Sequence, residues 1–307
     1  MKIELRIAVC IPTFNRKHQL GHAVQSLLKQ SDSDFDIYVF DDCSTDGTFE
    51  YIKDIQLHNP NVFYHLNEQN VGYVGNVNRC LELYTNYDWI GILHNDDFYS
   101  ENAITEVKKY LLKFPQAGII YSDCHIINEH GKIKKTTSRK LKVYNKGDEA
   151  ILASLSFIPC STTFYGSHAI RQTGFFKQNF PFSADEEYNS RLAENYSLIK
   201  IPFPIATVHL HGHNYRYETW KQSGFIQNYQ QMRQLMLKDV SLESGTRNKL
   251  ISEHMAKTCV HIFKELRKKG YKKEAKTYQE FLRNYEMPFI LKVPYILKLY
   301  CFRVILN

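Results

Sequence analysis

The sequence begins its first apolar run with Ile7-Ala8-Val9-Cys10-Ile11-Pro12, which passes directly into Thr13-Phe14-Asn15-Arg16. Continuous apolar residues predict a strand buried on both faces, and Pro12 predicts its end. Residues 17–29 then carry apolar side chains at helical spacing, from Leu20 to Leu28. A buried strand followed by an amphipathic helix is the repeating unit of a parallel sheet, so this stretch predicts an α/β fold.

The strand–helix pattern recurs over residues 1–120. Further buried strands are predicted at residues 35–40, 62–66 and 89–93, and helices at 46–55 and 74–84. This alternation predicts a Rossmann-like, doubly wound, mostly parallel sheet.

The pattern after residue 115 is mixed at first and then helical. We predict strands at 118–121, 125–128 and 205–211, a hairpin turn at 129–132, a basic mobile loop at 136–144 and a helix at 185–195. Helices are predicted at 222–238, 244–268 and 272–285. We therefore expect two domains, residues 1–215 and a helical, basic region over residues 216–307.

Polar side chains follow three of the predicted strands, at residues 13–16, 41–44 and 95–97. Ligands of doubly wound sheets bind beyond the carboxyl ends of the strands, where these clusters should meet. One such cluster would be an ordinary turn. Three of them predict a binding site at this edge of the sheet.

Composition narrows the class of protein. The 307 residues contain seven scattered Cys without a CxxC pair, which is typical of a reducing cytoplasm. We see no signal-peptide pattern and no apolar run of membrane-spanning length. The sequence also lacks the P-loop and GxGxxG motifs, and the Gly-rich basic loop that a sugar-1-phosphate nucleotidyltransferase would need.

The positive charge lies at the carboxyl-terminal end. Residues 246–307 carry 14 Lys and Arg against 5 Asp and Glu, a net of +9, whereas the whole chain carries +7. Residues 288–307 are mostly apolar but carry Lys292, Lys298 and Arg303, and we expect an interfacial helix at an anionic membrane surface. A helix that docks on the body, or a contact with a second subunit, is the alternative. No nucleic-acid-binding signature is present.

Several motifs resemble those of family 2 glycosyltransferases, which have the GT-A fold. Residues 9–16 are similar to the family's opening motif, and residues 41–48 resemble its second one. Asn70-Val71-Gly72 with Asn78 resembles the third, and Asn95-Asp96-Asp97 resembles the DxD metal motif. Asp185 with Glu187 and Arg191 is similar to the acceptor-side acidic motif, and residues 209–212 resemble the late histidine motif. The likeness covers residues 5–215.

The sequence departs from the family pattern at three places. Asn95 stands at the first position of the DxD motif, where the family has Asp. Asn76-Val77-Asn78 stands where the family often has Ala-Arg-Asn, so an Arg contact to the donor is missing or comes from elsewhere. Ala184-Asp185 replaces a Glu-Asp pair.

The resemblance implies a role for each matching residue. Asp97 and His211 are expected to bind Mn²⁺ or Mg²⁺, which stabilises a departing diphosphate. Asp42 is expected to accept the N3–H of uracil in a UDP-sugar donor. The other expected donor contacts are Pro12, Thr13, Asn15, Arg16, Gly72, Asn78, Asn95 and Asp96. Asp185 is expected to be the general base of an inverting transfer.

Each assignment has a structural alternative. Asp97 is otherwise a turn-capping carboxylate, and Asp42 a cap for the helix that follows its strand. Asp185 is otherwise a helix cap, with Glu187 and Arg191 as a surface pair. His209, His211 and His213 share one strand face and offer a zinc alternative.

The function expected from the resemblance is transfer of a sugar onto a glycan or lipid-linked glycan of the bacterial surface. The basic, apolar tail favours a cytoplasmic enzyme that is peripheral at the inner face of the cell membrane. The alternative is a non-catalytic carbohydrate- or membrane-binding protein with a decayed transferase domain. The transferred sugar and the oligomeric state stay open.

Overall fold

A computed structural model describes residues 5–128, 130–131, 133–134, 140–156, 158–180, 183–210, 215–222 and 224–285. The chain divides into two compact units, Met1–Leu210 and His211–Asn307.

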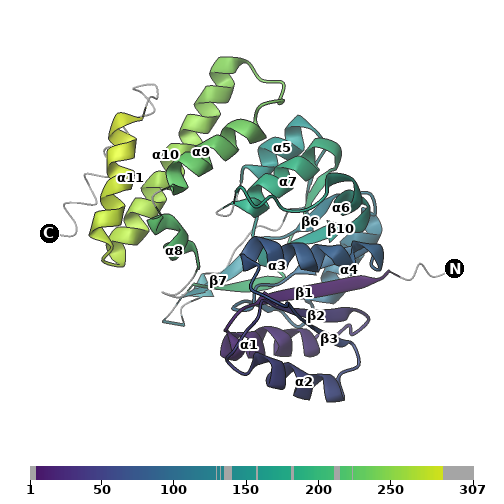
Figure 1. Cartoon of the computed structure of the whole chain (residues 1–307). Helices are drawn as coiled ribbons and strands as arrows, with labels where there is room; N and C mark the ends of the chain where they lie inside the picture. The colour runs from purple at the N-terminus through teal and green to yellow at the C-terminus, as the bar shows by residue number, and fades with distance from the viewer. Residues whose placement is uncertain are drawn as a thin grey trace. The chain divides into compact units, whose positions relative to one another are not determined.

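The first unit is built on an eight-stranded sheet (Figure 1). Its strands, in spatial order, are β3 (Val62–Leu66), β2 (Asp36–Asp41), β1 (Ile7–Thr13), β4 (Trp89–Ile92), β10 (Phe164–Gly166), β6 (Ile119–Tyr121), β11 (Leu198–Lys200) and β9 (Lys142–Tyr144). The first four are parallel, with Val9 opposite Ile37 and Gly91 in their register. Strand β10 is antiparallel to both of its neighbours, and β9 is antiparallel to β11. The predicted mostly parallel α/β sheet is confirmed.

Helices cover both faces of this sheet (Figure 1). The helices of the unit are α1 (Lys17–Leu28), α2 (Thr48–His58), α3 (Gly72–Leu81, extended by a 3₁₀ turn over Glu82–Thr85), α4 (Ala103–Lys113), α5 (Asp148–Ser154), α6 (Ser167–Thr173) and α7 (Ala184–Asn195). Buried side chains of α1, α2 and α4 pack with Val9 and Ile37 on one face. Helix α3 lies on the other, where Cys10 contacts the carbonyl of Cys80. The sheet is therefore doubly wound, as predicted.

A second, four-stranded sheet lies beside the first. Its order is β5 (Phe98–Tyr99), β12 (Ala206–Leu210), β7 (Cys124–Asn128) and β8 (Ile133–Lys134). Strand β12 runs parallel to β7, and β8 returns antiparallel to β7 as the predicted hairpin. Strand β5 follows directly on Asp97, so this sheet continues from the edge that carries the polar clusters.

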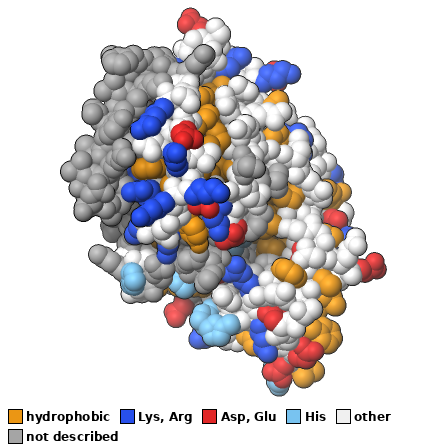
Figure 2. All heavy atoms as spheres, turned by 60° about the vertical axis from the view of Figure 1, so that its left-hand side comes forward, with side chains coloured by type: hydrophobic (Ala, Val, Ile, Leu, Met, Phe, Trp, Pro, Cys, Tyr) orange, Lys and Arg blue, Asp and Glu red, His pale blue; other side chains and the backbone are white. Residues whose placement is uncertain are grey.

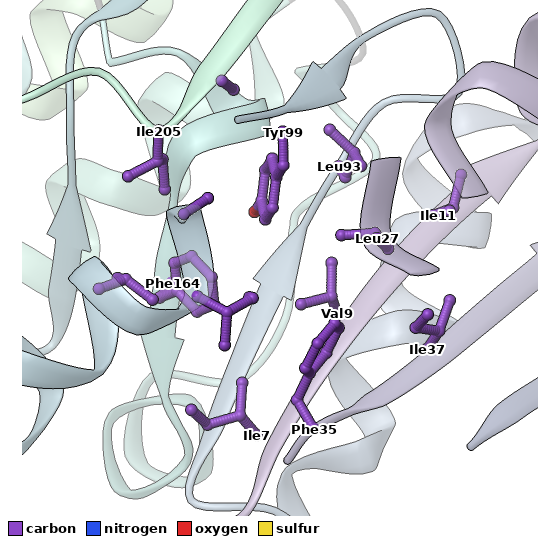
Figure 3. Packing of buried hydrophobic residues seen from close by; sticks show 14 of the residues in the cluster. Ile7, Val9, Ile11, Leu27, Phe35, Ile37, Leu93, Tyr99, Phe164 and Ile205 are labelled. Atoms are coloured by element: carbon purple, nitrogen blue, oxygen red, sulfur yellow. The ribbon is translucent and has the colours of Figure 1, made fainter. Parts of the chain in front are cut away.

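The hydrophobic core of the first unit joins the two sheets. Figure 3 shows Val9, Leu27 and Ile37 packed on one side of the cluster, with Tyr99 and Phe164 toward the other. Gly91 on β4 allows the close approach of Phe164, because a Cβ there would lie 2.7 Å from its ring. Close packing of these buried side chains keeps the strands rigid, so the polar clusters at the strand ends are held in fixed positions.

Several elements differ from the sequence prediction. The basic segment 136–144, predicted as a mobile loop, contains β9, which pairs with β11 through Lys142, Val143 and Tyr144; residues 135–139 lie outside the described ones. Strands β5, β10 and β11 and helices α4, α5 and α6 were not predicted. Strands of two or three residues are too short to show a period, and tertiary pairing decides them.

The second unit is helical. It contains α8 (Tyr215–Lys221), α9 (Phe225–Met236), α10 (Ser244–Lys268) and α11 (Lys272–Asn284). Its core includes Met232, Met255, Ile262 and Tyr278. Gly270, with φ at +87°, makes the turn between α10 and α11.

The surface of the second unit is basic. Helices α10 and α11 carry ten Lys and Arg against four Asp and Glu, and Figure 2 shows many Lys and Arg side chains on the face that it presents. Among the described residues, no helix has the length and hydropathy needed to cross a membrane. The predicted interfacial segment, residues 288–307, lies outside the described residues.

Candidate active site

The three polar clusters meet at the carboxyl edge of β1, β2 and β4. The buried Thr13 is the meeting point: its carbonyl accepts the amide of Asp42 (2.9 Å), and its hydroxyl accepts Asn95 Nδ2 (3.1 Å). Arg16 lies 3.9 Å from the Asp96 carboxylate. Residues that are far apart in the chain therefore share one edge, as the parallel sheet predicted.

The loops after β1 and β2 are tied to each other. Asn15, held at a φ of +49°, donates its amide to Ser44 Oγ (2.8 Å) and accepts the amide of Thr45 on Oδ1 (2.8 Å). Asp46 accepts the amide of Lys17 on one oxygen and that of Thr48 on the other, so it caps α1 and α2 together. These bonds occupy Asn15 within the protein, and a donor contact by it stays a prediction. Pro12 lies inside β1, opposite Phe40 in β2, and the strand continues to Thr13, one residue beyond its predicted end at Pro12.

Asp42 caps a helix, but a different one from that considered in the sequence. Its carboxylate accepts the amides of Val71 (2.8 Å) and Gly72 (2.9 Å) at the start of α3, and Asn67 Nδ2 (2.9 Å). The helix after β2 is capped by Asp46 instead. Asp42 is 3% exposed. It therefore joins the edge of the sheet to α3, and its predicted contact with a uracil base stays a prediction.

Residues in and near the third predicted motif have separate structural roles. Gly72 has φ at +74°, where a Cβ would meet nothing within 4 Å, so the backbone conformation alone explains the glycine. Val77, at the position of the family's Arg, is fully buried and offers no donor contact. Asn78 exchanges two hydrogen bonds with the backbone of Phe176 (2.9 and 3.0 Å), and its predicted donor contact stays a prediction.

A group of possible metal ligands follows β4. One ligand atom each from His94, Asp96 and Asp97 lies within 4.8 Å of the others. The sequence prediction named both Asp residues but missed His94, although it directly precedes the motif, two residues after β4 ends. The predicted partner ligand, His211, lies outside the described residues, as does His213 of the zinc alternative.

Asp97 is held by distant segments of the chain. Its Oδ1 accepts the amide of His209 (2.9 Å), 112 residues away, and its Oδ2 accepts the hydroxyl of Ser161. A turn-capping Asp would bind amides of its own turn, so these contacts disfavour that alternative. His209 thus reaches the cluster through its backbone.

The electrostatics of the cluster favour a cation. Burial raises the pKa of the Asp97 carboxyl to about 6, with Asp96 adding to the rise and His94 opposing it. Burial lowers the pKa of His94, but Cys160, Asp97 and Asp96 outweigh it and raise that pKa to about 10. Two adjacent carboxylates with an imidazole are a ligand set that suits Mn²⁺, and their oxygens suit Mg²⁺. A cation that takes His94 as a ligand must first displace its proton.

Tyr73 is the residue that connects the cluster with α7, and the sequence prediction missed it. Its hydroxyl lies 3.1 Å from His94 Nε2 and 3.9 Å from Cys160 Sγ. Burial raises the pKa of Tyr73, and the negative charge of Asp185 contributes to that rise. Asp185 also raises the pKa of Tyr165, which burial dominates. Asp185 is therefore within electrostatic reach of the groups that surround the cluster.

Asp185 lies in the first turn of α7, which is packed firmly in place. Tyr188 on this helix is buried against Phe176, with ring centroids 4.5 Å apart. Glu187 and Arg191 form a bidentate pair (2.8 and 3.0 Å), and Arg191 also binds the carbonyls of Thr173 and Phe175. The alternative of a surface pair is wrong, because Glu187 is 5% exposed. The pair anchors α7 to the segment before it.

Comparisons with known proteins agree with this architecture. The sequence profile of the glycosyl transferase family 2 matches residues 8–175. The Escherichia coli protein named UDP-Glc:alpha-D-GlcNAc-diphosphoundecaprenol beta-1,3-glucosyltransferase WfgD is 25% identical over 182 residues, 59% of this chain and 66% of the relative. The Campylobacter jejuni GalNAc(5)-diNAcBac-PP-undecaprenol beta-1,3-glucosyltransferase is 28% identical over 138 residues, 44% of this chain and 43% of the relative.

Solved structures share the fold at low sequence identity. S. aureus TarS 1-349 in complex with UDP-GlcNAc has a TM-score of 0.64 and 15% identity, over 97% of this chain and 80% of that one. The mannosyltransferase PcManGT from Pyrobaculum calidifontis, in complex with GDP-Man and Mn²⁺, has a TM-score of 0.59 and 14% identity, over 97% and 82%. The predicted GT-A fold is confirmed. The family profile matches more than half of the residues of this chain, and the chain therefore belongs to glycosyl transferase family 2.

Proposed function

We propose that the protein transfers a sugar from a UDP-sugar to a hydroxyl group of a glycan or lipid-linked glycan, with inversion at the anomeric carbon. The observation that carries the proposal is the gathering of Thr13, Asp42 and the His94–Asp97 cluster at one sheet edge. Tyr73, whose hydroxyl lies 3.1 Å from His94 Nε2, is itself within electrostatic reach of Asp185. A nucleotide site, a cation site and a carboxylate base are the three parts that such a transfer needs.

The donor half of the site suits a nucleotide. Phe14 is 44% exposed beside the buried Thr13, and it offers an apolar ring to a base. Asp42 accepts three protein donors, so a base N–H would be a fourth, directed at a remaining lone pair. Arg16 lies beside Asp96, and we expect it to contact a diphosphate held there, in place of the Arg that the family often has at the position of Val77. UDP is the nucleotide in the names of WfgD and the TarS complex, whereas PcManGT holds GDP-Man.

A divalent cation fits the same edge. Asp96, Asp97 and His94 would hold it, and His211 is the further ligand expected from the family resemblance. When bound, such an ion neutralises the charge that develops on a departing diphosphate.

The protein's own residues then perform the proton transfer. The acceptor oxygen bonds to the anomeric carbon as the bond from that carbon to the diphosphate oxygen breaks. The electron pair leaves with the nucleoside diphosphate, and the hydroxyl proton passes to the Asp185 carboxylate. Attack opposite the leaving group inverts the anomeric carbon, and the rigid packing of α7 holds the carboxylate in place for it.

The relatives and the tail support the proposed acceptor class and location. Two relatives carry undecaprenol-linked glycans in their names, which supports a lipid-linked acceptor in surface polysaccharide synthesis. We place the enzyme in the cytoplasm at the inner membrane face, with residues 288–307 as the membrane contact. A helical region of net positive charge favours anionic lipid.

The test is release of nucleoside diphosphate from a panel of UDP-sugars and GDP-mannose, with Mn²⁺, Mg²⁺ or a chelator. We expect UDP release from at least one UDP-sugar, lost with the chelator. Asp185→Asn should lower the transfer rate by about 100-fold or more, because general-base catalysis contributes that much, while UDP affinity stays the same. Glu186→Gln, in the same helical turn, is the matched control and should retain activity.

Three outcomes would contradict the proposal. No turnover of any donor, with sugar nucleotide still bound, would favour a non-catalytic carbohydrate-binding protein. Release of GDP alone would overturn the assignment of uracil. Retention of configuration in the product would exclude the single displacement at Asp185.

A further inference from the structure

The second unit contains a groove between three of its helices. The groove has a volume of about 510 Å³, within the range of small-molecule sites. Its walls come from residues at helical i, i+3 and i+4 spacing, so each helix turns one face toward it. The polar members are Gln230 and Gln234 on α9, Asn248 on α10 and Asn284 on α11, and the aromatic members are Phe281 and Tyr285.

The four carboxamides are available to a ligand. Within the described part of the chain, Gln230, Gln234, Asn248 and Asn284 make no hydrogen bond through their side chains. Each carboxamide offers a carbonyl acceptor and two N–H donors. A ligand whose groups both donate and accept would match all four.

The aromatic side of the groove is a pair of rings tilted against each other. Phe281 and Tyr285 have ring centroids 4.6 Å apart, at an angle of 31°. Both rings are half-buried, and Tyr285 hydrogen-bonds Ser252 in the groove wall, which fixes its position. Two rings at one edge present an apolar surface beside the polar carboxamides.

The groove is uncharged although its helices are not. No Lys, Arg, Asp or Glu is among the described residues that line it, whereas α10 and α11 carry ten Lys and Arg against four Asp and Glu. Phosphate groups and anionic lipids bind cationic side chains, so this lining disfavours them. A neutral ligand with hydroxyl groups and an apolar face fits the lining best.

We propose that this groove binds a neutral oligosaccharide. Sugar hydroxyls both donate and accept hydrogen bonds and match the carboxamides, and the C–H face of a pyranose ring packs on Phe281 and Tyr285. The groove gives the second unit a glycan-binding function of its own, beyond the transfer reaction. Only the choice of bacterial surface glycans as probes rests on the proposed function.

The test is binding of the full chain to an array of neutral and acidic bacterial surface oligosaccharides, without any donor, followed by saturation-transfer NMR on those that bind. We expect neutral oligosaccharides to bind and the wild-type signal to fall at least tenfold in Asn248→Asp and Asn284→Asp. These isosteric changes remove N–H donors and add a negative charge. Gln222→Glu, an exposed residue of the same unit outside the groove, has the same chemical change and should bind as the wild type does.

The outcomes separate this proposal from the transferase assignment. Loss of glycan binding in the groove variants, with UDP release from the donor unchanged, supports the groove. Binding that survives both Asn→Asp changes and Phe281→Ala overturns it, as does an array on which no neutral glycan binds. A transferase that proves inactive but still binds glycan through Asn248 and Asn284 leaves the groove standing and refutes only the catalytic proposal.

Discussion

The replacement of Asp42 by Asn tests whether this residue holds the site together as well as contacting the donor. The carboxylate accepts Asn67 and Val71 on Oδ1 and Gly72 on Oδ2, in a position that is 3% exposed. An Asn side chain keeps two of these bonds through its carbonyl oxygen. The NH₂ group of the Asn then faces the backbone N–H of Gly72. Both groups are donors, so the hydrogen bond from Gly72 is lost.

The expected loss follows from those three contacts. A hydrogen bond to a charged group contributes about 1.5–3 kcal/mol, and the two remaining bonds lose their charge assistance. Asp42→Asn should therefore lower the free energy of unfolding by about 2–3 kcal/mol. Glu82→Gln is the matched control: its partner Arg79 is exposed, so the change should cost about 0.5 kcal/mol or less.

Unfolding in urea is followed by circular dichroism. UDP affinity is measured by calorimetry without urea, at a temperature at which the wild type and the variant are both folded. A free energy of unfolding within about 0.5 kcal/mol of the wild type would refute the claim that Asp42 anchors α3. Lower stability with unchanged UDP affinity would keep the anchor and refute the predicted uracil contact. A further tenfold loss of UDP affinity, equivalent to about 1.4 kcal/mol, would support both roles.

Three further experiments probe the site and the second unit. Gly72→Ala and Gly270→Ala both place a Cβ at positive φ, where it would meet no protein atom within 4 Å, so each should lower the free energy of unfolding by about 1–2 kcal/mol. Only Gly72→Ala should also weaken UDP binding. Equal UDP affinity in the two variants would contradict a donor contact at Gly72. Asp97→Ala should abolish metal-dependent turnover, and turnover that still responds to Mn²⁺ in this variant would exclude Asp97 as a ligand. Burial, with Arg233 and Lys257 adding to it, lowers the pKa of His254 to about 4, so the unfolded chain binds a proton that the folded one does not between pH 6.5 and 4. Stability should fall by about 1 kcal/mol from pH 7.5 to 5.0, after allowance for partial exposure, and His254→Gln should flatten that slope; an equal slope in both proteins would place the pH dependence elsewhere.

The sheet and its site edge could be read from local patterns. The strand at residues 62–66 and the helix at 244–268 were predicted with the bounds that the structure has. Continuous apolar runs and helical spacing are properties of neighbouring residues, and burial enforces them. Because parallel strands share a carboxyl edge, Thr13, Asp42 and Asn95 could be placed together without coordinates.

The partners of these residues depend on contacts that no local pattern encodes. Asp97 binds Ser161 and His209, 64 and 112 residues away, and such pairings appear only when both sheets have formed. Tyr73 gave no signal beyond its place after Gly72, because a tyrosine in a helix is more often a core residue. Asn78 and Phe176 are 98 residues apart, so their hydrogen bond also forms only when distant segments pack together.

The amino-acid sequence by itself determined the α/β alternation, the edge at which a nucleotide would bind and the family to which the chain belongs. These follow from periodicity and from short motifs, whose residues are near one another in the chain. Only the tertiary structure decided that Asp42 caps α3, that His94 joins the two Asp residues, and that three helices bring four carboxamides, unpaired within the described part of the chain, to one groove. Those arrangements depend on how distant segments pack, and packing is a property of the whole core that no single stretch specifies.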